Sequence, residues 1–153
     1  MVTSNGPAWY RRGDALRSAV EYLSASSPAF NWVGIYLLTG DTLELGPFIG
    51  APTEHTRIKV GIGVCGTAVA HNADMNVPDV HASDNYLACS VDTRSELVVL
   101  IRDAAGAIVG QIDIDSHTPA AFGPREAQLV KEVADELGKR WLEAVGSVET
   151  HTH

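Results

Sequence analysis

Two segments of the chain repeat their apolar residues every three or four positions, which is the period of an α-helix. The first covers residues 14–24, and Asp14 is a suitable N-cap. The second begins at Gly123 with Pro124 in its first turn, and its apolar stripe continues to Val145 before Gly146. The pattern therefore predicts one helix near each end of the chain.

Between these helices, short runs of β-branched and aromatic residues predict strands. Residues 30–38 and 42–48 flank the turn at 39–41, and residues 96–101 and 107–115 flank the turn at 103–106, so each pair predicts a hairpin. Two shorter candidates are residues 57–60 and 76–80, and the second lies near a sheet edge because it contains Pro78. This order predicts an α+β fold in which one antiparallel sheet carries the two terminal helices.

The remaining segments are a short helix and a loop. Residues 66–71 read as a helix that follows a glycine-rich turn around Cys65. Residues 81–93 are polar and irregular, and a loop of this length in a compact domain is usually functional or disordered. If the terminal helices cover one face of the sheet, this loop is the natural lid of a pocket on the other face.

Length and charge limit the classes of protein to which this chain can belong. The chain has 153 residues, which suits a single domain, here expected at 14–146 between a loose segment at 1–13 and a loose tail at 147–153. Its formal net charge is −8, and the bases form no cluster, so we expect no nucleic-acid partner. No apolar run approaches the roughly 20 residues that span a bilayer, and no secretory signal is visible. We therefore expect no membrane partner and a cytoplasmic protein.

The chain has only two cysteines, Cys65 and Cys89, too few for a disulfide scaffold. By itself Cys65 is best explained as a small buried residue, although a nearby helix N-terminus would favour its thiolate. Cys89 lies in the polar loop, where accessibility and burial are equally plausible. Together they could form a redox pair if the fold brings their α-carbons within about 7 Å.

Three carboxylates form the second candidate site. Asp113 and Asp115 are two positions apart on one strand and point to one face, where an exposed polar surface is the simpler explanation. If Glu96 joins them from a neighbouring strand, a ligand is the better explanation, because adjacent acids on a sheet repel one another. The acids would then bind a cation or an ammonium group. No calcium-loop or zinc-protease motif accompanies them, so we expect no metal.

Two aromatic residues share a face of the first strand. Trp32 and Tyr36 are four positions apart. Core packing is their default role, and the functional alternative is the wall of a small-ligand pocket.

Seven motifs together resemble one family. They are, in order, Asn-Trp-Val-Gly-Ile-Tyr, Gly-Pro-Phe, Gly-Val-Cys-Gly-Thr-Ala, Val-Pro-Asp-Val, Ala-Cys followed by Ser-Glu-Leu-Val-Val, Gly-Gln-Ile-Asp-Ile-Asp-Ser, and Phe-Gly-Pro. This set resembles the free methionine-(R)-sulfoxide reductases, which are stand-alone GAF domain proteins, over about residues 30–143.

The resemblance implies a six-stranded antiparallel GAF sheet with the terminal helices on one face and a loop-covered pocket on the other. It implies reduction of free L-methionine (R)-sulfoxide with electrons from thioredoxin and no cofactor. It also implies a homodimer, since members are often dimers. The implied roles are attacking cysteine for Cys89, resolving cysteine for Cys65, substrate-binding acids for Glu96, Asp113 and Asp115, and pocket aromatics for Trp32 and Tyr36.

The chain also departs from the family pattern. Met75 stands where many members have a third cysteine, and Tyr86 and Ser90 replace the usual His and Asp near Cys89. The alternative to a reductase is a GAF domain that binds a small ligand or senses redox state without turnover.

Overall fold

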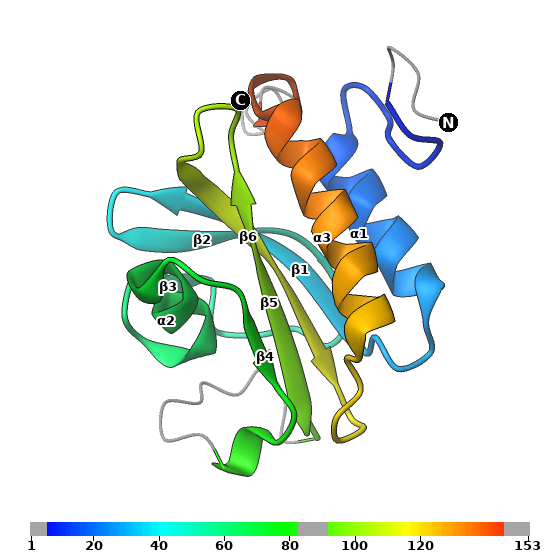
Figure 1. Cartoon of the computed structure of the whole chain (residues 1–153), viewed down its shortest axis with the longest axis vertical. Coiled ribbons are helices and arrows are strands. Elements are labelled where there is room, and N and C mark those ends of the chain that lie inside the picture. The colour runs from blue at the N-terminus through cyan, green and yellow to red at the C-terminus, as the bar shows by residue number, and fades with distance from the viewer. Residues whose placement is uncertain (1–5, 83–91, 146–153) are drawn as a thin grey trace.

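The computed structural model describes residues 6–82 and 92–145 (Figure 1). Along the chain its elements are α1 (Ala15–Ser26), β1 (Trp32–Thr39), β2 (Thr42–Ile49), β3 (Arg57–Lys59), α2 (Gly63–His71), β4 (Met75–Val77), the 3-10 turn η1 (Val80–Ala82), β5 (Ser95–Arg102), β6 (Ile108–Ser116) and α3 (Pro124–Lys139).

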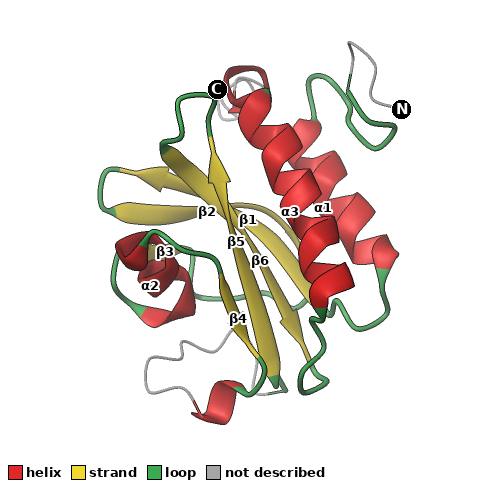
Figure 2. Ribbon diagram, viewed as in Figure 1, coloured by secondary structure: helices red, strands yellow, loops and turns green. Residues whose placement is uncertain are grey.

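The strands form one six-stranded sheet in the order β3-β2-β1-β6-β5-β4, and each neighbouring pair is antiparallel (Figure 2). The two predicted hairpins, β1–β2 and β5–β6, meet where β1 pairs with β6. β4 lies at an edge, and Pro78 follows its last residue, as expected from a residue that cannot donate to a ladder. The α+β fold with a six-stranded antiparallel sheet is confirmed.

One face of the sheet is covered by α1 and α3, which run side by side along its flank (Figure 1). Their apolar stripes pack on the strand positions that point toward them, and Val33, Ile35, Ile112 and Ile114 are completely buried there. The predicted placement of both terminal helices on one face is therefore correct.

The opposite face carries α2 and a separate apolar cluster. Trp32, Tyr36, Val98 and Leu100 project from the strands into this cluster, and Cys65 of α2 packs among them. Because side chains alternate along a strand, the residues between the core positions of the first face all reach this second face.

Two helix boundaries differ from the sequence prediction. α2 begins at Gly63, three residues before the predicted start, so Cys65 lies within its first turn. α3 ends at Lys139, and residues 141–145 form a further helical turn after a break at Arg140. The break follows Gly138, whose α-carbon lies so close to the carbonyl of Arg102 that the contact with β5 leaves no room for a side chain. Apolar periodicity cannot detect a break that keeps the stripe in phase.

The described part of the N-terminal segment packs against the helices. Tyr10 is buried, its hydroxyl donates a hydrogen bond of 2.7 Å to Glu143, and the Arg140 guanidinium lies 5.1 Å from its ring centroid. The division of the chain into a loose segment at 1–13, a domain at 14–146 and a tail at 147–153 stays a prediction. None of the described helices has the length and apolarity needed to cross a membrane.

Candidate functional site

The three predicted carboxylates meet on the sheet face that carries α2. Asp113 and Asp115 point the same way from β6, and Glu96 of β5 is the direct cross-strand partner of Asp115. All three are buried, with no more than 3% of any of them exposed. Burial contradicts the simpler explanation of an exposed polar surface. Three acids in so small a buried volume are stabilising only if protons or a ligand offset their charge.

Burial and mutual repulsion control the protonation of this cluster. Loss of solvation raises the pKa of Glu96 well above its ordinary range, and the charges of Asp113 and Asp115 raise it further. Burial also raises the pKa of Asp113, although hydrogen bonds with Glu96 and Cys65 oppose that rise. Of these two acids, Glu96 therefore has the stronger tendency to keep its proton.

The α2 helix places a thiol beside these acids. Cys65 is 4% exposed, and its Sγ lies 3.8 Å from Oε2 of Glu96. The side-chain amide of Gln111 donates a hydrogen bond of 3.0 Å to the Cys65 carbonyl, which ties α2 to β6. Gly66 lets the helix approach β3, since a side chain at this position would collide with the Lys59 carbonyl. Cys65 is thus both buried and adjacent to ionisable groups.

Sequence reasoning missed Gln111. It lies two residues before Asp113 on β6, and the same alternation that paired Asp113 with Asp115 places it on their face. The available signal was therefore a third polar residue in that row.

Trp32 forms a wall next to the acids. It is the β1 cross-strand partner of Asp115, and Gly34 is the partner of Asp113. The indole donates a hydrogen bond of 3.0 Å to the Ala51 carbonyl and stacks on Phe48 with ring centroids 5.6 Å apart. Its ring lies across Gly34, where an added Cβ would be 2.6 Å from the Trp32 Cζ3 atom.

Tyr36 lies further along the same face. It is completely buried, and its hydroxyl donates a hydrogen bond of 2.8 Å to the carbonyl of His55 in the segment between β2 and β3. Both aromatics therefore have a packing role in the second core cluster, and only Trp32 pairs with one of the acids across β1 and β6.

A small cavity opens between α2 and the acids. It is lined by His55, Ile58, Ile62, Gly63, Val64, Cys65, Glu96 and Asp113. The space within it is about 10 Å³, room for roughly one water molecule. Ile62 is 51% exposed at its edge. Glu96, Asp113 and Cys65 share this cavity, while Trp32, Tyr36 and Asp115 are not among its lining residues.

Comparison with known proteins identifies the fold family. The sequence pattern of the GAF domain matches residues 12–141, which is most of the chain. The chain belongs to the GAF domain family.

Relatives of this GAF domain include named enzymes. It is 42% identical over 109 residues to the free methionine-R-sulfoxide reductase of Escherichia coli and 36% identical over 112 residues to that of Saccharomyces cerevisiae, covering 71% of this chain in each case. The matches span 65% and 62% of those relatives, slightly less than two thirds of their length.

Solved structures agree with this family resemblance. The free methionine-R-sulfoxide reductase from Neisseria meningitidis, determined in complex with its substrate, superposes with a TM-score of 0.79 at 36% identity and covers 87% of this chain and 79% of that one. The type II enzyme from Thermoplasma acidophilum gives a TM-score of 0.76 at 38% identity, covering 87% and 89%. The resemblance inferred from the sequence motifs is therefore confirmed.

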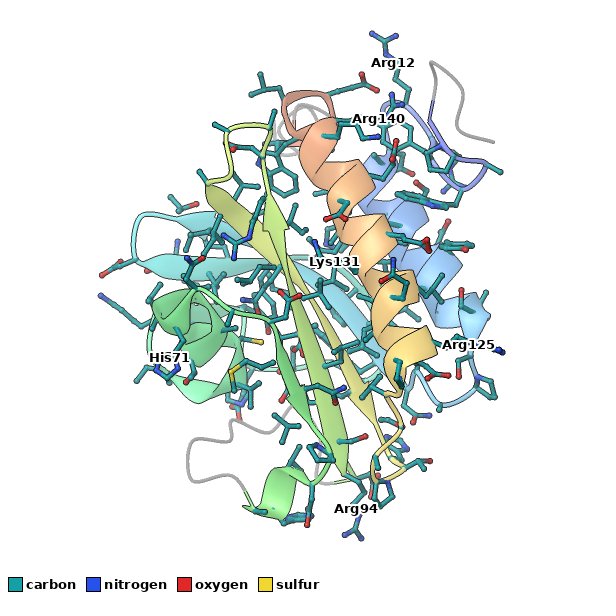
Figure 3. The ribbon with its side chains drawn as sticks, viewed as in Figure 1. Arg12, His71, Arg94, Arg125, Lys131 and Arg140 are labelled. Carbon is teal, nitrogen blue, oxygen red and sulfur yellow. The ribbon has the colours of Figure 1, made fainter. Side chains whose placement is uncertain are left out.

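The GAF domain also brings potential metal ligands together. The Cys65 sulfur and one oxygen each of Glu96 and Asp113 lie within 4.8 Å of one another. Three arginines lie at the ends of the molecule: Figure 3 shows Arg12 and Arg140 near one end of α3, and Arg94 near the opposite end of the sheet. Cys89 lies outside the described residues, so its predicted role stays a prediction, as do the substrate-binding roles of the acids and aromatics.

Proposed function

We propose that this protein reduces free L-methionine (R)-sulfoxide to L-methionine through a thiol, sulfenic acid and disulfide cycle recycled by thioredoxin. One observation carries the proposal: three buried carboxyl groups meet beside a buried thiol. The family supports it, because relatives at 36% and 42% identity bear the name of this reductase.

The acid cluster suits the ammonium group of a free amino acid. Glu96, Asp113 and Asp115 place more negative charge in one buried region than the fold needs, and an ammonium would offset it with charge-assisted hydrogen bonds. A methionine sulfoxide within a peptide has no ammonium at this position. The cluster would therefore select the free amino acid, with Trp32 and Tyr36 on the same sheet face to contact its apolar part.

The raised pKa of Glu96 suits the first chemical step. A sulfoxide becomes a good electrophile when its oxygen is protonated, and a carboxyl group whose pKa is raised well above its ordinary range suits the role of general acid. The Cys89 thiolate attacks the sulfur, the S–O bond breaks, and the oxygen ends on the Cys89 sulfur. Methionine leaves, and Cys89 is a sulfenic acid.

The second step uses Cys65. Its thiol attacks the Cys89 sulfenic sulfur, a disulfide forms, and the oxygen leaves as water. The dithiol of thioredoxin then reduces the disulfide and is itself oxidised. Cys65 suits this role because its sulfur lies 3.8 Å from Glu96, the proposed proton donor to the substrate.

The test is thioredoxin-coupled oxidation of NADPH with free methionine (R)-sulfoxide as substrate. Wild-type protein should turn over, and Cys89→Ser should abolish activity. Cys65→Ser should still release one methionine per protein and then stop, because its sulfenic acid has no resolving thiol. Turnover that survives Cys89→Ser would contradict the proposal.

The acids have a matched control. Glu96→Gln should lower kcat because an amide cannot serve as the acid, while Glu132→Gln on the exposed surface of α3 should leave the rate unchanged. A folded wild-type protein that binds methionine sulfoxide without any turnover would instead support the non-catalytic GAF alternative. The homodimer and the cytoplasmic location remain predictions.

A further inference from the structure

Three ligand atoms of the right kind for a soft metal ion come from three different elements. Cys65 belongs to α2, Glu96 to β5 and Asp113 to β6, and their ligand atoms all lie within 4.8 Å of one another. The Cys65 sulfur lies 3.8 Å from a Glu96 oxygen. Around a tetrahedral zinc ion such atoms lie roughly 3.3–3.5 Å apart, given Zn–S of about 2.3 Å and Zn–O of about 2.0 Å. Separations of up to 4.8 Å would have to shorten by at most about 1.5 Å to reach that geometry.

The hydrogen bonding of Asp113 is a second, independent observation that points to a bound cation. It is completely buried and lines the cavity. Apart from Glu96 and Cys65, no described group donates a hydrogen bond to either of its carboxyl oxygens. Burying a carboxylate without such donors or a cation costs free energy of folding. The oxygens of this side chain are therefore available to coordinate a cation.

The cavity between these side chains has space for one small ion or one water molecule. Its volume of about 10 Å³ corresponds to roughly one water molecule. Zinc sites with three protein ligands commonly complete their tetrahedron with water. The three side chains and one water therefore make a full coordination shell.

We propose that this cavity binds a thiophilic divalent cation, Zn²⁺, through the Cys65 thiolate, Glu96, Asp113 and one water. The thiolate selects zinc over Mg²⁺ and Ca²⁺, which prefer shells made only of oxygen. On binding, the Cys65 thiol and any protonated carboxyl group release their protons to solvent. Zinc then occupies two of the acids, Glu96 and Asp113, that the reductase proposal assigns to the substrate, so the two exclude each other; this single consequence rests on the proposed function.

The test uses Co²⁺ as a spectroscopic substitute for zinc. Adding Co²⁺ to the fully reduced protein should produce a thiolate-to-cobalt charge-transfer band that saturates at one equivalent, and Zn²⁺ should remove it by displacement. Cys65→Ser should abolish the band, and Asp113→Asn should weaken binding by more than about tenfold. Cys89→Ser and the matched surface variant Glu132→Gln should keep the band.

A wild-type protein without the band, or a band that survives Cys65→Ser, would overturn the metal site. Circular dichroism checks that each variant is folded, and Glu96→Gln replaces Asp113→Asn if that variant is not.

The kinetic experiment separates the two proposals. Zn²⁺ should inhibit turnover competitively with free methionine sulfoxide. Metal binding without competition would leave the zinc site intact and contradict the shared use of the acids. Normal turnover without metal binding would overturn the zinc site alone.

Discussion

Glu96→Gln should change how the stability of the protein depends on pH. Burial and the neighbouring carboxylates hold the pKa of Glu96 well above its ordinary value of 4.5. Between those two pKa values the folded protein keeps a proton that the unfolded chain has released, so the free energy of unfolding falls as pH rises. For one proton the slope is about 1.4 kcal/mol per pH unit. This loss begins above about pH 4.5 and continues up to the folded pKa.

Glutamine removes that loss because it is a neutral isostere of the protonated acid. Its amide can also donate a hydrogen bond to Asp113, which favours the ionised form of Asp113 and lowers its pKa. The variant should therefore become more stable than the wild type by a margin that grows by about 1.4 kcal/mol per pH unit up to the folded pKa.

Urea unfolding from about pH 5 to about pH 8 measures this margin, and taking the difference between the two proteins cancels the titration of the histidines. Glu132→Gln on the exposed face of α3 is the control, and its curve should run parallel to the wild type. Parallel curves for Glu96→Gln and the wild type would refute the assignment of the retained proton to Glu96. Higher stability with lower activity would mark the cluster as a functional site.

Three further substitutions test packing, two on the sheet face that carries the site and one where α3 contacts β5. Gly34→Ala places a Cβ 2.6 Å from Trp32 Cζ3, so the indole must move. We therefore expect KM for free methionine sulfoxide to rise more than kcat falls. An unchanged KM would contradict the role of Trp32 as a wall of the substrate site. Gly138→Ala forces α3 away from the Arg102 carbonyl, and an overpacking cost of about 1–3 kcal/mol should exceed the helix-propensity gain of up to about 1 kcal/mol, as measured by urea unfolding. Tyr36→Phe removes a hydrogen bond of 2.8 Å and should cost about 1 kcal/mol in the same measurement, with no loss if the hydroxyl is dispensable.

Much of the fold could be predicted from periodicity. Two helical stripes, two hairpins and a proline near an edge strand lead to an antiparallel sheet with terminal helices, and each appears in the structure. The predicted helix boundaries are wrong where they depend on contacts that the local sequence pattern does not record. The apolar stripe of α3 continues across the break at Arg140, and the close approach of Gly138 to Arg102 just before it joins residues that are far apart in the sequence.

The candidate site could be predicted in part. Alternation placed Asp113 and Asp115 on one face, and the expectation that Glu96 joins them from a neighbouring strand is correct because β5 pairs with β6 in that register. Gln111 was missed although it lies in the same row. The distance between Cys65 and Glu96 could not be predicted, since it depends on how α2 packs over the sheet.

The sequence by itself therefore determined the elements, the family and the chemical types at the site, because these follow from local spacing and from motifs that lie along the chain. Only the tertiary structure decided how those residues change one another's burial and protonation. Protonation of Glu96 and the exposed or buried state of the acids depend on desolvation and on distances between strands. Such distances arise when β1, β5 and β6 pair and α2 covers them, and no single segment contains that information.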